Sequence, residues 1–353
     1  MILNKFKIKG VTLKNRIVVS PMCQYSGKNG CPTSWHYNHL SNLIKSGAGM
    51  VMIESTAVSK NGKITHKDLC LSNLIQENKF KRLKKFLSKI NDTPMGIQIS
   101  HAGRKGSSFV PWIKGNTPLG KKNKSWKTVS ASAIKRDKNW PTPKELNTKE
   151  IIKIINQFKN TALRVKRIGF DCLEIHMAHG YLLHQFLSPI SNKRSDEFGL
   201  GKNKLSNFPL KIAKEVRKIW PKNKILGARI TATDHLSGGI SIKDSILLSN
   251  ILKKVGFDYV CVSSGGILPK TKMKIKKAFR KDLSKRIKKK TNIKVRTSGQ
   301  IDSFALAEKI IKENIVDFVA VGRMFIKNPN WIKIASKEQN VKGYIPNQYK
   351  RCF

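Results

Sequence analysis

Two histidines and a tyrosine near the middle of the chain could act together on a carbonyl group. His176 ends the short apolar run 172–176, and His179 and Tyr181 follow it. Imidazole N–H groups can hold a carbonyl oxygen and stabilise the negative charge that develops on it. A tyrosine hydroxyl can protonate the adjacent carbon. We expect the three side chains to bind an enone-type substrate. Buried core histidines are the alternative, and we expect no metal because further ligands are not evident nearby.

Two later segments end in residues suited to an anion. The apolar run 293–297 is followed by Gly299, and the run 318–322 ends in Gly322 and precedes Arg323. Glycines let backbone N–H groups approach a phosphate closely, and an arginine can pair with it. The two segments together predict a phosphate site.

The elements that must position these residues alternate along the chain. Apolar runs of four to six residues without alternation are typical of parallel strands buried on both faces. The expected strands cover residues 16–20, 50–54, 96–100, 172–176, 225–230, 259–263, 293–297 and 318–322. The expected helices cover residues 37–47, 77–91, 148–168, 208–219, 242–255, 279–290, 302–313 and 329–338. This pattern predicts an α/β fold, a single (β/α)8 TIM barrel over residues 1–353, with its active site at the carboxyl ends of the strands.

Two segments fall outside this repeat. Residues 101–147 follow the third strand and are rich in Gly, Pro, Trp and Lys, so we expect a lid-like loop at the active-site end. Residues 339–353 form a short tail. In the helix at 148–168, we expect Thr148 to be the N-cap and Ile152 to be one of the buried residues.

The charge of the chain is strongly positive. It carries 70 Lys and Arg against 21 Asp and Glu, a formal net charge of +49. Such a charge could serve nucleic-acid binding. However, lysines are spread along the whole chain, so solvated helix faces are the preferred interpretation, and we expect no nucleic-acid partner. The densest run, at 270–290, stays ambiguous.

Composition also narrows the class of protein. The six cysteines show no C-x2-C spacing, which argues against a zinc or iron–sulfur site. No apolar stretch approaches the length of a membrane span, and the first residues lack the apolar core of a signal peptide. We therefore expect a cytoplasmic protein without a membrane partner.

Five sequence blocks resemble the signature blocks of the Old Yellow Enzyme family, and Cys23 and Arg351 are similar to residues of its bacterial, thermophilic-like branch. The resemblance extends from about residue 6 to the end of the chain. The blocks are Val19-Ser-Pro-Met-Cys-Gln-Tyr25, Gln98-Ile-Ser-His-Ala-Gly-Arg-Lys105, Glu174-Ile-His-Met-Ala-His-Gly-Tyr181, Leu187-Ser-Pro-Ile-Ser-Asn-Lys-Arg194 and Val321-Gly-Arg323.

The resemblance implies an FMN-dependent ene-reductase that takes electrons from NADPH or NADH. It implies that hydride passes to the β-carbon of an activated alkene and that Tyr181 protonates the α-carbon. The implied FMN-binding residues are Ser20, Pro21, Met22, Cys23, Ala57, Gln98, Arg229, Gly299, Gly322 and Arg323. The implied substrate-binding residues are Tyr25, His176, His179, Tyr181 and Arg351, with Cys23 also touching the substrate. Arg351 would reach into a neighbouring subunit, which implies a homodimer or a dimer-based tetramer.

Some residues depart from the family pattern. Lys276-Lys-Ala278 stands where relatives commonly carry Pro-Gly-Tyr, and Phe353 stands where tryptophan is frequent. One alternative is a tRNA dihydrouridine synthase-like flavoprotein, which would explain the charge and superficially matches Asn29-Gly-Cys-Pro32. The surrounding pattern of that first loop fits the Old Yellow Enzymes better. The sequence leaves the physiological alkene and the choice of nicotinamide open.

Overall fold

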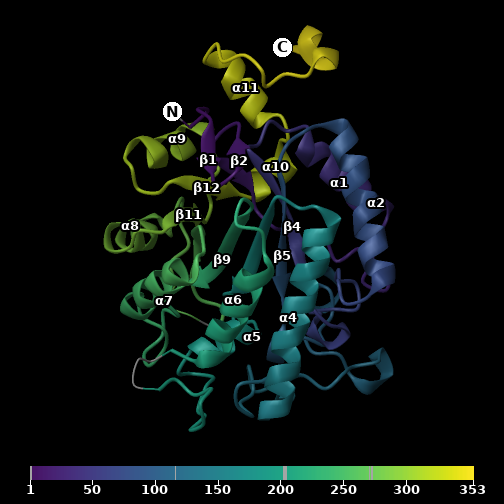
Figure 1. The fold of residues 1–353 in the computed structure, drawn as a ribbon, viewed down its shortest axis with the longest axis vertical. Coiled ribbons are helices and arrows are strands. Elements are labelled where there is room, and N and C mark those ends of the chain that lie inside the picture. The colour runs from purple at the N-terminus through teal and green to yellow at the C-terminus, as the bar shows by residue number, and fades with distance from the viewer. Residues whose placement is uncertain (1, 116, 202–204, 270, 272) are drawn as a thin grey trace.

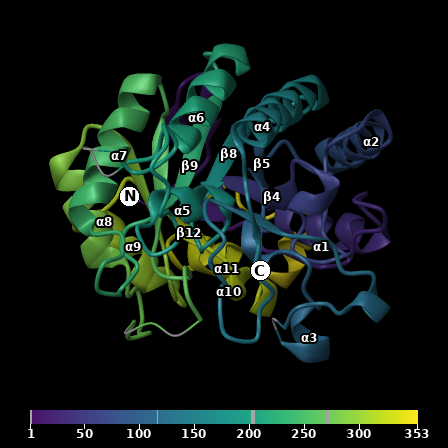
Figure 2. The same ribbon diagram turned by 90° about the horizontal axis from the view of Figure 1, so that it is seen from below.

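The computed structural model describes the whole chain except residues 1, 116, 202–204, 270 and 272. Eight parallel strands close into a barrel in the order β10-β11-β12-β3-β4-β5-β8-β9, with helices around it (Figures 1 and 2). The predicted (β/α)8 barrel is therefore confirmed. The strands are β3 (Ile17–Val19), β4 (Met50–Ala57), β5 (Met95–Ser100), β8 (Cys172–Met177), β9 (Ile225–Thr231), β10 (Tyr259–Ser263), β11 (Lys294–Ser298) and β12 (Phe318–Val321).

The surrounding helices match the expected positions, with ends shifted by up to three residues. They are α1 (Ser34–Ile44), α2 (Leu74–Ile90), α4 (Thr148–Ile168), α6 (Asn207–Ile219), α7 (Ile242–Val255), α8 (Lys281–Lys290), α9 (Phe304–Lys312) and α11 (Trp331–Glu338). The short helices α5 (Leu182–Leu187) and α10 (Arg323–Lys327) were not expected from the sequence. Among the described residues, no helix has the length and hydrophobicity needed to cross a membrane.

Helix α4 corrects two expectations. Its N-cap is Asn147 and not Thr148, because the Asn147 side chain accepts a hydrogen bond from the Glu150 N–H while Glu150 reaches back to the Asn147 N–H. Ile152 is 50% exposed, whereas Ile154 is buried. The apolar face of this helix is therefore rotated slightly from the face that the sequence indicated.

A polar layer crosses the barrel interior. Glu174 on β8 forms a fully buried ion pair with Arg296 on β11. The same carboxylate accepts hydrogen bonds from the Tyr259 hydroxyl at 2.8 Å and from Gln98 Nε2 at 2.8 Å. Four strands of the barrel are thereby joined through one carboxylate.

An N-terminal hairpin closes the amino end of the barrel. It consists of β1 (Phe6–Ile8) and β2 (Val11–Leu13), which pair antiparallel. The Phe6 ring lies 5.5 Å from the ring of Phe318, between centroids, so the hairpin packs on the first residue of β12. Because the hairpin covers the amino end of the barrel, the carboxyl end is the one open to a ligand.

The segment at 101–147 and the C-terminal tail lie at different ends of the molecule (Figure 1). The first contains short elements only: η2 (Gly103–Lys105), α3 (Pro111–Lys114), η3 (Lys121–Asn123), β6 (Val129–Ser130) and β7 (Lys144–Glu145). The tail is fixed near the N-terminus, where the Tyr344 hydroxyl donates to the carbonyl oxygens of Leu3 at 2.9 Å and Lys14 at 3.0 Å. It ends in η4 (Asn347–Cys352).

Candidate active site

A cavity of about 590 Å³ opens at the carboxyl ends of β3, β9, β11 and β12. Seven of the ten residues expected to bind a cofactor line it: Ser20, Pro21, Met22, Arg229, Gly299, Gly322 and Arg323. The barrel thus brings together segments that are about 300 residues apart in the sequence. The remaining three, Cys23, Ala57 and Gln98, do not line this cavity.

The two glycines leave the space that the cavity needs. Gly299 has a φ of 129°, and a Cβ placed on it would lie 2.9 Å from Cε1 of Phe279. A Cβ on Gly322 would lie 3.1 Å from Sδ of Met22. A side chain at 299 would therefore strain the backbone and press on the Phe279 ring, next to the cavity residue Arg280.

Three arginines give the cavity a strong positive field. Arg229 and Arg323 were expected there, and Arg280 is a lining residue that the sequence interpretation missed. Burial, together with the nearby charges of Arg229 and Arg323, lowers the pKa of Arg280 to about 9. Within the described part of the chain, the buried Nε of Arg229 has no hydrogen-bond partner. A buried donor without a partner is costly, so this cavity is suited to an anionic ligand.

The predicted His-His-Tyr set is assembled beside this cavity. The His176 ring centroid lies 4.9 Å from those of both His179 and Tyr181. In the sheet, His176 pairs in register with Arg229, which connects the two groups of site residues. The three side chains expected from the sequence to act together therefore do lie together.

The proton positions on the two histidines follow from their hydrogen bonds. Burial, followed by the charge of Arg229, holds the pKa of each well below its usual value, so both rings are neutral. His176 Nδ1 accepts from the Ala178 N–H at 3.1 Å, which places the His176 proton on Nε2. This Nε2 lies 3.1 Å from His179 Nδ1.

Ser263, at the end of β10, determines which ring nitrogen of His179 carries the proton. Its buried hydroxyl oxygen lies 2.5 Å from His179 Nε2. When Ser263 donates this bond, the proton of His179 is on Nδ1, and two N–H groups point at one place between the rings. When His179 donates instead, its Nδ1 accepts from His176. An oxygen ligand that binds both rings selects the first arrangement.

The Tyr181 hydroxyl is held in its neutral, protonated form. Burial raises its pKa well above the usual value, and the Cys23 and Asp68 side chains add to this effect. The Tyr25 hydroxyl and the Cys23 thiol also have raised pKa values, again first because of burial. These groups therefore carry their protons at neutral pH.

Backbone strain marks the same region. Tyr25 has a φ of 48° and His179 a φ of 59°, in the left-handed region that favours glycine. Strain of this kind tends to gather at functional sites, where surrounding contacts hold it in place. Here Lys105 contributes one such contact, because its Nζ donates to the His179 carbonyl oxygen at 2.6 Å. The Lys105 ammonium also lies 4.8 Å from the Tyr181 ring centroid.

The other expected residues lie farther from the cavity. Ala57 is the last residue of β4 and is buried, rather than following the strand as expected. The Gln98 side chain is directed at Glu174 in the polar layer. Arg351 is exposed in the tail, which is fixed at the amino end of the barrel. It is therefore distant from its own chain's His176 and Tyr181.

Comparison with known proteins agrees with this geometry. The family model described as the NADH:flavin oxidoreductase / NADH oxidase family matches residues 2–342. The chain belongs to this family. It is 36% identical to an NADPH dehydrogenase of Clostridium acetobutylicum, covering 100% of this chain and 99% of the relative. It is 39% identical to an NADH:flavin oxidoreductase of Gibberella zeae, covering 98% and 87%, respectively.

Solved structures share the fold of this NADH:flavin oxidoreductase family member. A morphinone reductase in complex with tetrahydroNAD matches with a TM-score of 0.75 at 21% identity, covering 98% of this chain and 92% of that one. An Old Yellow Enzyme homologue from Zymomonas mobilis matches with a TM-score of 0.78 at 19% identity, covering 96% and 92%. The expected Old Yellow Enzyme family is confirmed, whereas the thermophilic-like branch stays a prediction.

The family match establishes the cofactors. The protein is an FMN-dependent oxidoreductase that uses NADH or NADPH as electron donor. The cavity is chemically suited to FMN, since it combines the unpartnered Arg229 Nε, two further arginines and the space beside Gly299. The family match over residues 2–342 argues against the dihydrouridine synthase-like alternative.

Proposed function

We propose that the protein reduces the activated C=C bond of α,β-unsaturated carbonyl compounds with electrons from NADH or NADPH. The observation that supports this most is the meeting of His176 Nε2 and His179 Nδ1, 3.1 Å apart, beside the protonated Tyr181. Two N–H donors aimed at one point suit a single carbonyl oxygen. Neutral rings suit this task because they can donate without adding a buried charge.

The same proposal assigns the cavity to FMN. Gly299, Gly322 and Arg323 would hold its phosphate, Arg280 would add a second cation there, and Arg229 would lie near its ring system. Ser20, Pro21, Met22, Cys23, Ala57 and Gln98 keep the FMN-binding roles that the family resemblance implies. When bound, FMN supplies the two-electron chemistry that links the nicotinamide to the alkene.

The substrate would be bound and protonated by this chain's own side chains. The histidines would polarise the carbonyl and stabilise the charge that develops on its oxygen as the β-carbon is reduced. Tyr181 would deliver the proton to the α-carbon, and its raised pKa keeps that proton available throughout the neutral range. Tyr25 and Cys23 would line the substrate side of the site.

A neighbouring subunit would complete the proposed site by contributing Arg351. Because the tail lies at the end of the barrel opposite the site, Arg351 could take part in catalysis only in another copy of the chain. A guanidinium group can close a pocket over a substrate oxygen or an aromatic face. The active protein would then be a homodimer or a dimer-based tetramer.

The purified protein tests the proposal directly. We expect a yellow protein with FMN bound, bleached anaerobically by NADPH or NADH and recoloured by 2-cyclohexenone with formation of cyclohexanone. Phenols should give a long-wavelength absorption band, because a phenolate oxygen would occupy the place between His176 and His179. The His176→Ala/His179→Ala variant should keep FMN and lose that band. Normal phenol binding in this variant, or no reduction of any enone by the wild type, would show that the proposal is wrong.

A further inference from the structure

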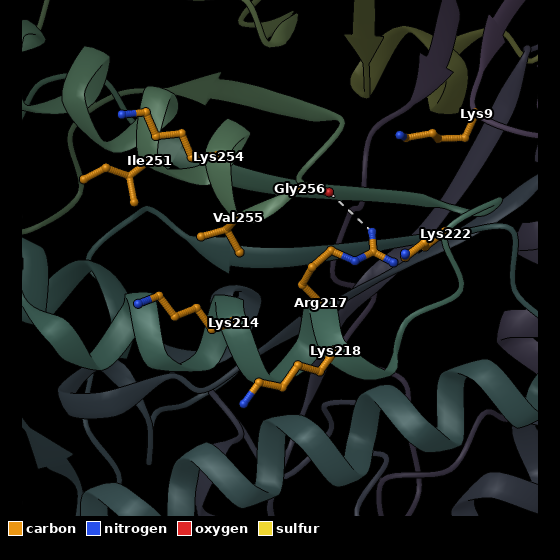
Figure 3. A pocket seen from close by; sticks show the side chains of 9 residues that line it. All are labelled: Lys9, Lys214, Arg217, Lys218, Lys222, Ile251, Lys254, Val255 and Gly256. Atoms are coloured by element: carbon orange, nitrogen blue, oxygen red, sulfur yellow. Dashed lines mark hydrogen bonds between the residues drawn. The ribbon is translucent and has the colours of Figure 1, made fainter.

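A second hollow lies on the outer surface at the amino end of the barrel, between α6, α7 and the turn of the N-terminal hairpin. Its volume is about 790 Å³, larger than that of the arginine-lined cavity. Six basic residues line it: Lys9, Lys214, Arg217, Lys218, Lys222 and Lys254. Figure 3 shows these side chains arranged around the hollow, with Ile251 and Val255 of α7 between them. No acidic residue is among the described lining residues.

Most of this positive charge is not neutralised locally. Within the part of the chain that the structure describes, Lys214, Lys222 and Lys254 have no carboxylate at ion-pair distance. Lys9 Nζ lies 3.5 Å from Asp258 Oδ1, and Lys218 Nζ lies 2.5 Å from Glu215 Oε1, so these two lysines are paired with carboxylates. Cations placed around one hollow repel each other unless an anion lies between them.

Arg217 is the fixed member of the group. Its guanidinium donates to the carbonyl oxygens of Gly256, at 3.3 Å, and of Trp220. Carbonyl groups orient the side chain but do not cancel its charge. A pre-oriented guanidinium loses little conformational entropy when it binds an anion, and it suits the forked geometry of phosphate oxygens.

The hollow is also partly apolar. Ile251 and Val255 contribute aliphatic surface, and the stems of the lysines extend it. An apolar surface surrounded by cations favours a ligand with a flat apolar body and several negative charges over a simple inorganic anion. A volume of this size accommodates a molecule of several hundred daltons.

We propose that this basic hollow binds an organic polyphosphate of the nucleotide type. Its phosphates would lie between Arg217 and the lysines, and its base would lie on Ile251 and Val255. Gly10 N–H donates to the carbonyl oxygen of Asn223 at 2.9 Å, so the hairpin turn that carries Lys9 is tied to the loop after α6. The hollow is at the amino end of the barrel and is therefore separate from the FMN cavity.

The test must separate a specific site from the general excess of lysine. Calorimetric titration of the FMN-loaded enzyme with ATP, without magnesium and at 0.15 M salt, should show one molecule bound per chain. Salt at this level screens charges more than about 8 Å apart. The variant Lys214→Gln/Lys222→Gln/Lys254→Gln should bind ATP about 30-fold more weakly, since losing one solvent-exposed charge contact weakens binding by about threefold and the three losses multiply. These lysines are exposed, so folding should be unaffected.

A matched control removes three charges elsewhere. Lys285→Gln/Lys289→Gln/Lys290→Gln lies on α8, where these side chains are exposed, and should bind ATP as the wild type does. ATP should also bind more tightly than tripolyphosphate, because only ATP covers the apolar floor. Equal losses in the two triple variants, no ATP binding, or tighter binding of tripolyphosphate would overturn the proposal. So would binding of a single-stranded oligonucleotide in preference to ATP, which would indicate a charged surface.

Discussion

The position of one proton on His179 decides whether the histidine pair can hold a substrate oxygen. His176 is fixed as a donor by the Ala178 N–H, so its tautomer does not depend on a ligand. His179 becomes the second donor only when the Ser263 hydroxyl donates to its Nε2. Ser263 would therefore be a positioning residue for the proposed reaction, acting through His179 without touching the substrate.

Replacing Ser263 with alanine tests this role. The variant should bind phenols and enones about fivefold more weakly, because a lost hydrogen bond contributes about 1 kcal/mol. FMN content should not change, and Ser263→Thr should restore part of the affinity. Absorbance titration with a phenol provides the measurement. Ser249→Ala removes another buried serine hydroxyl, on α7, and is the control. If both alanine variants lose affinity equally, the effect of Ser263 is general and not due to the tautomer.

Replacing Tyr181 with phenylalanine tests the proposed proton donor. Reoxidation of the reduced enzyme by cyclohexenone should slow by about 10²–10⁴-fold, the usual cost of losing a general acid. Reduction of the enzyme by NADPH should change little, because this half of the reaction needs no proton from Tyr181. Anaerobic stopped-flow absorbance measures the two halves separately. Equal slowing of both would instead indicate a structural role for the tyrosine.

Sequence reasoning found some site residues and missed others for identifiable physical reasons. His176 and Tyr181 stand out because they follow a short apolar run, where a barrel places its active site. Ser263 ends a similar run, but a lone serine has no chemical pattern. Arg280 lies within the lysine-rich run 270–290, so one more basic residue there could not be recognised as a candidate site residue. The closed barrel brings Arg280 to the same cavity as Arg229 and Arg323, and local sequence does not reveal this.

At the scale of elements, the connections after β11 and β12 line one side of the arginine-lined cavity, where they would hold the FMN phosphate. Gly299 adopts a φ that only glycine takes up easily, and Gly322 leads directly into α10. Arg280 comes from the connection before α8 and has its Nε 3.1 Å from the Ser264 hydroxyl oxygen. Three connections therefore meet at one cavity. The connection after β12 contributes Arg323, and the connection before α8 contributes Arg280.

Removing these arginines should weaken FMN binding to different degrees. Arg323→Ala should purify with most of its FMN lost, since a charge-assisted contact contributes about 1.5–3 kcal/mol. Arg280→Gln should keep part of its FMN, because the amide can still donate a hydrogen bond. Flavin absorbance per chain after gel filtration gives the measurement, and Arg286→Ala on α8 is the control. Full FMN retention by Arg323→Ala would contradict the assignment of this cavity.

Element ends were harder to predict than element positions. Periodicity identified α4 to the residue, but its N-cap is Asn147 because that side chain accepts from Glu150 N–H. Helix α5 was missed, since all six of its residues are buried and a uniformly buried helix shows no polar face. The paired ends of distant strands, such as His176 beside Arg229, depend on the closed sheet and cannot be read from local sequence.

At the scale of the whole molecule, the two ends of the barrel carry different features. The arginine-lined cavity and the histidine pair lie at the carboxyl ends of the strands. The hairpin and the tail lie together at the amino ends (Figure 1). The basic hollow, which Lys9 of the hairpin turn lines, lies at the same end. A tail fixed at the amino end by Tyr344 is directed away from its own chain's site.

Deleting residues 351–353 tests whether the tail serves a neighbouring chain. We expect a lower kcat/KM for cyclohexenone with FMN retained, because Arg351 would no longer close the site of the partner. Light scattering should show at least a dimer for the wild type. A truncated enzyme with unchanged kinetics, or a fully active wild-type monomer, would contradict the proposed role of Arg351.

The polar layer inside the barrel allows a test of stability. Glu174→Gln or Arg296→Met alone should destabilise the fold by about 3–5 kcal/mol, because each leaves a buried charge unpaired. The double variant should lose far less than the sum of the two single losses. Its amide oxygen can still accept from Gln98 Nε2, and its NH2 group can donate to the Tyr259 hydroxyl oxygen. Urea unfolding followed by circular dichroism measures the coupling. Additive losses would show that the two charges act independently.

The buried pair of Glu174 and Arg296 also constrains how this protein can diverge. A lineage that changes either residue first must pass through a poorly folded intermediate, although the doubly changed protein would be viable. The two positions should therefore be retained together or exchanged together among descendants. Neither residue is among those that line the arginine-lined cavity. If positions 174 and 296 prove invariant, the reason would be that each single change destabilises the fold. Their invariance should not be taken as a sign that they act in catalysis.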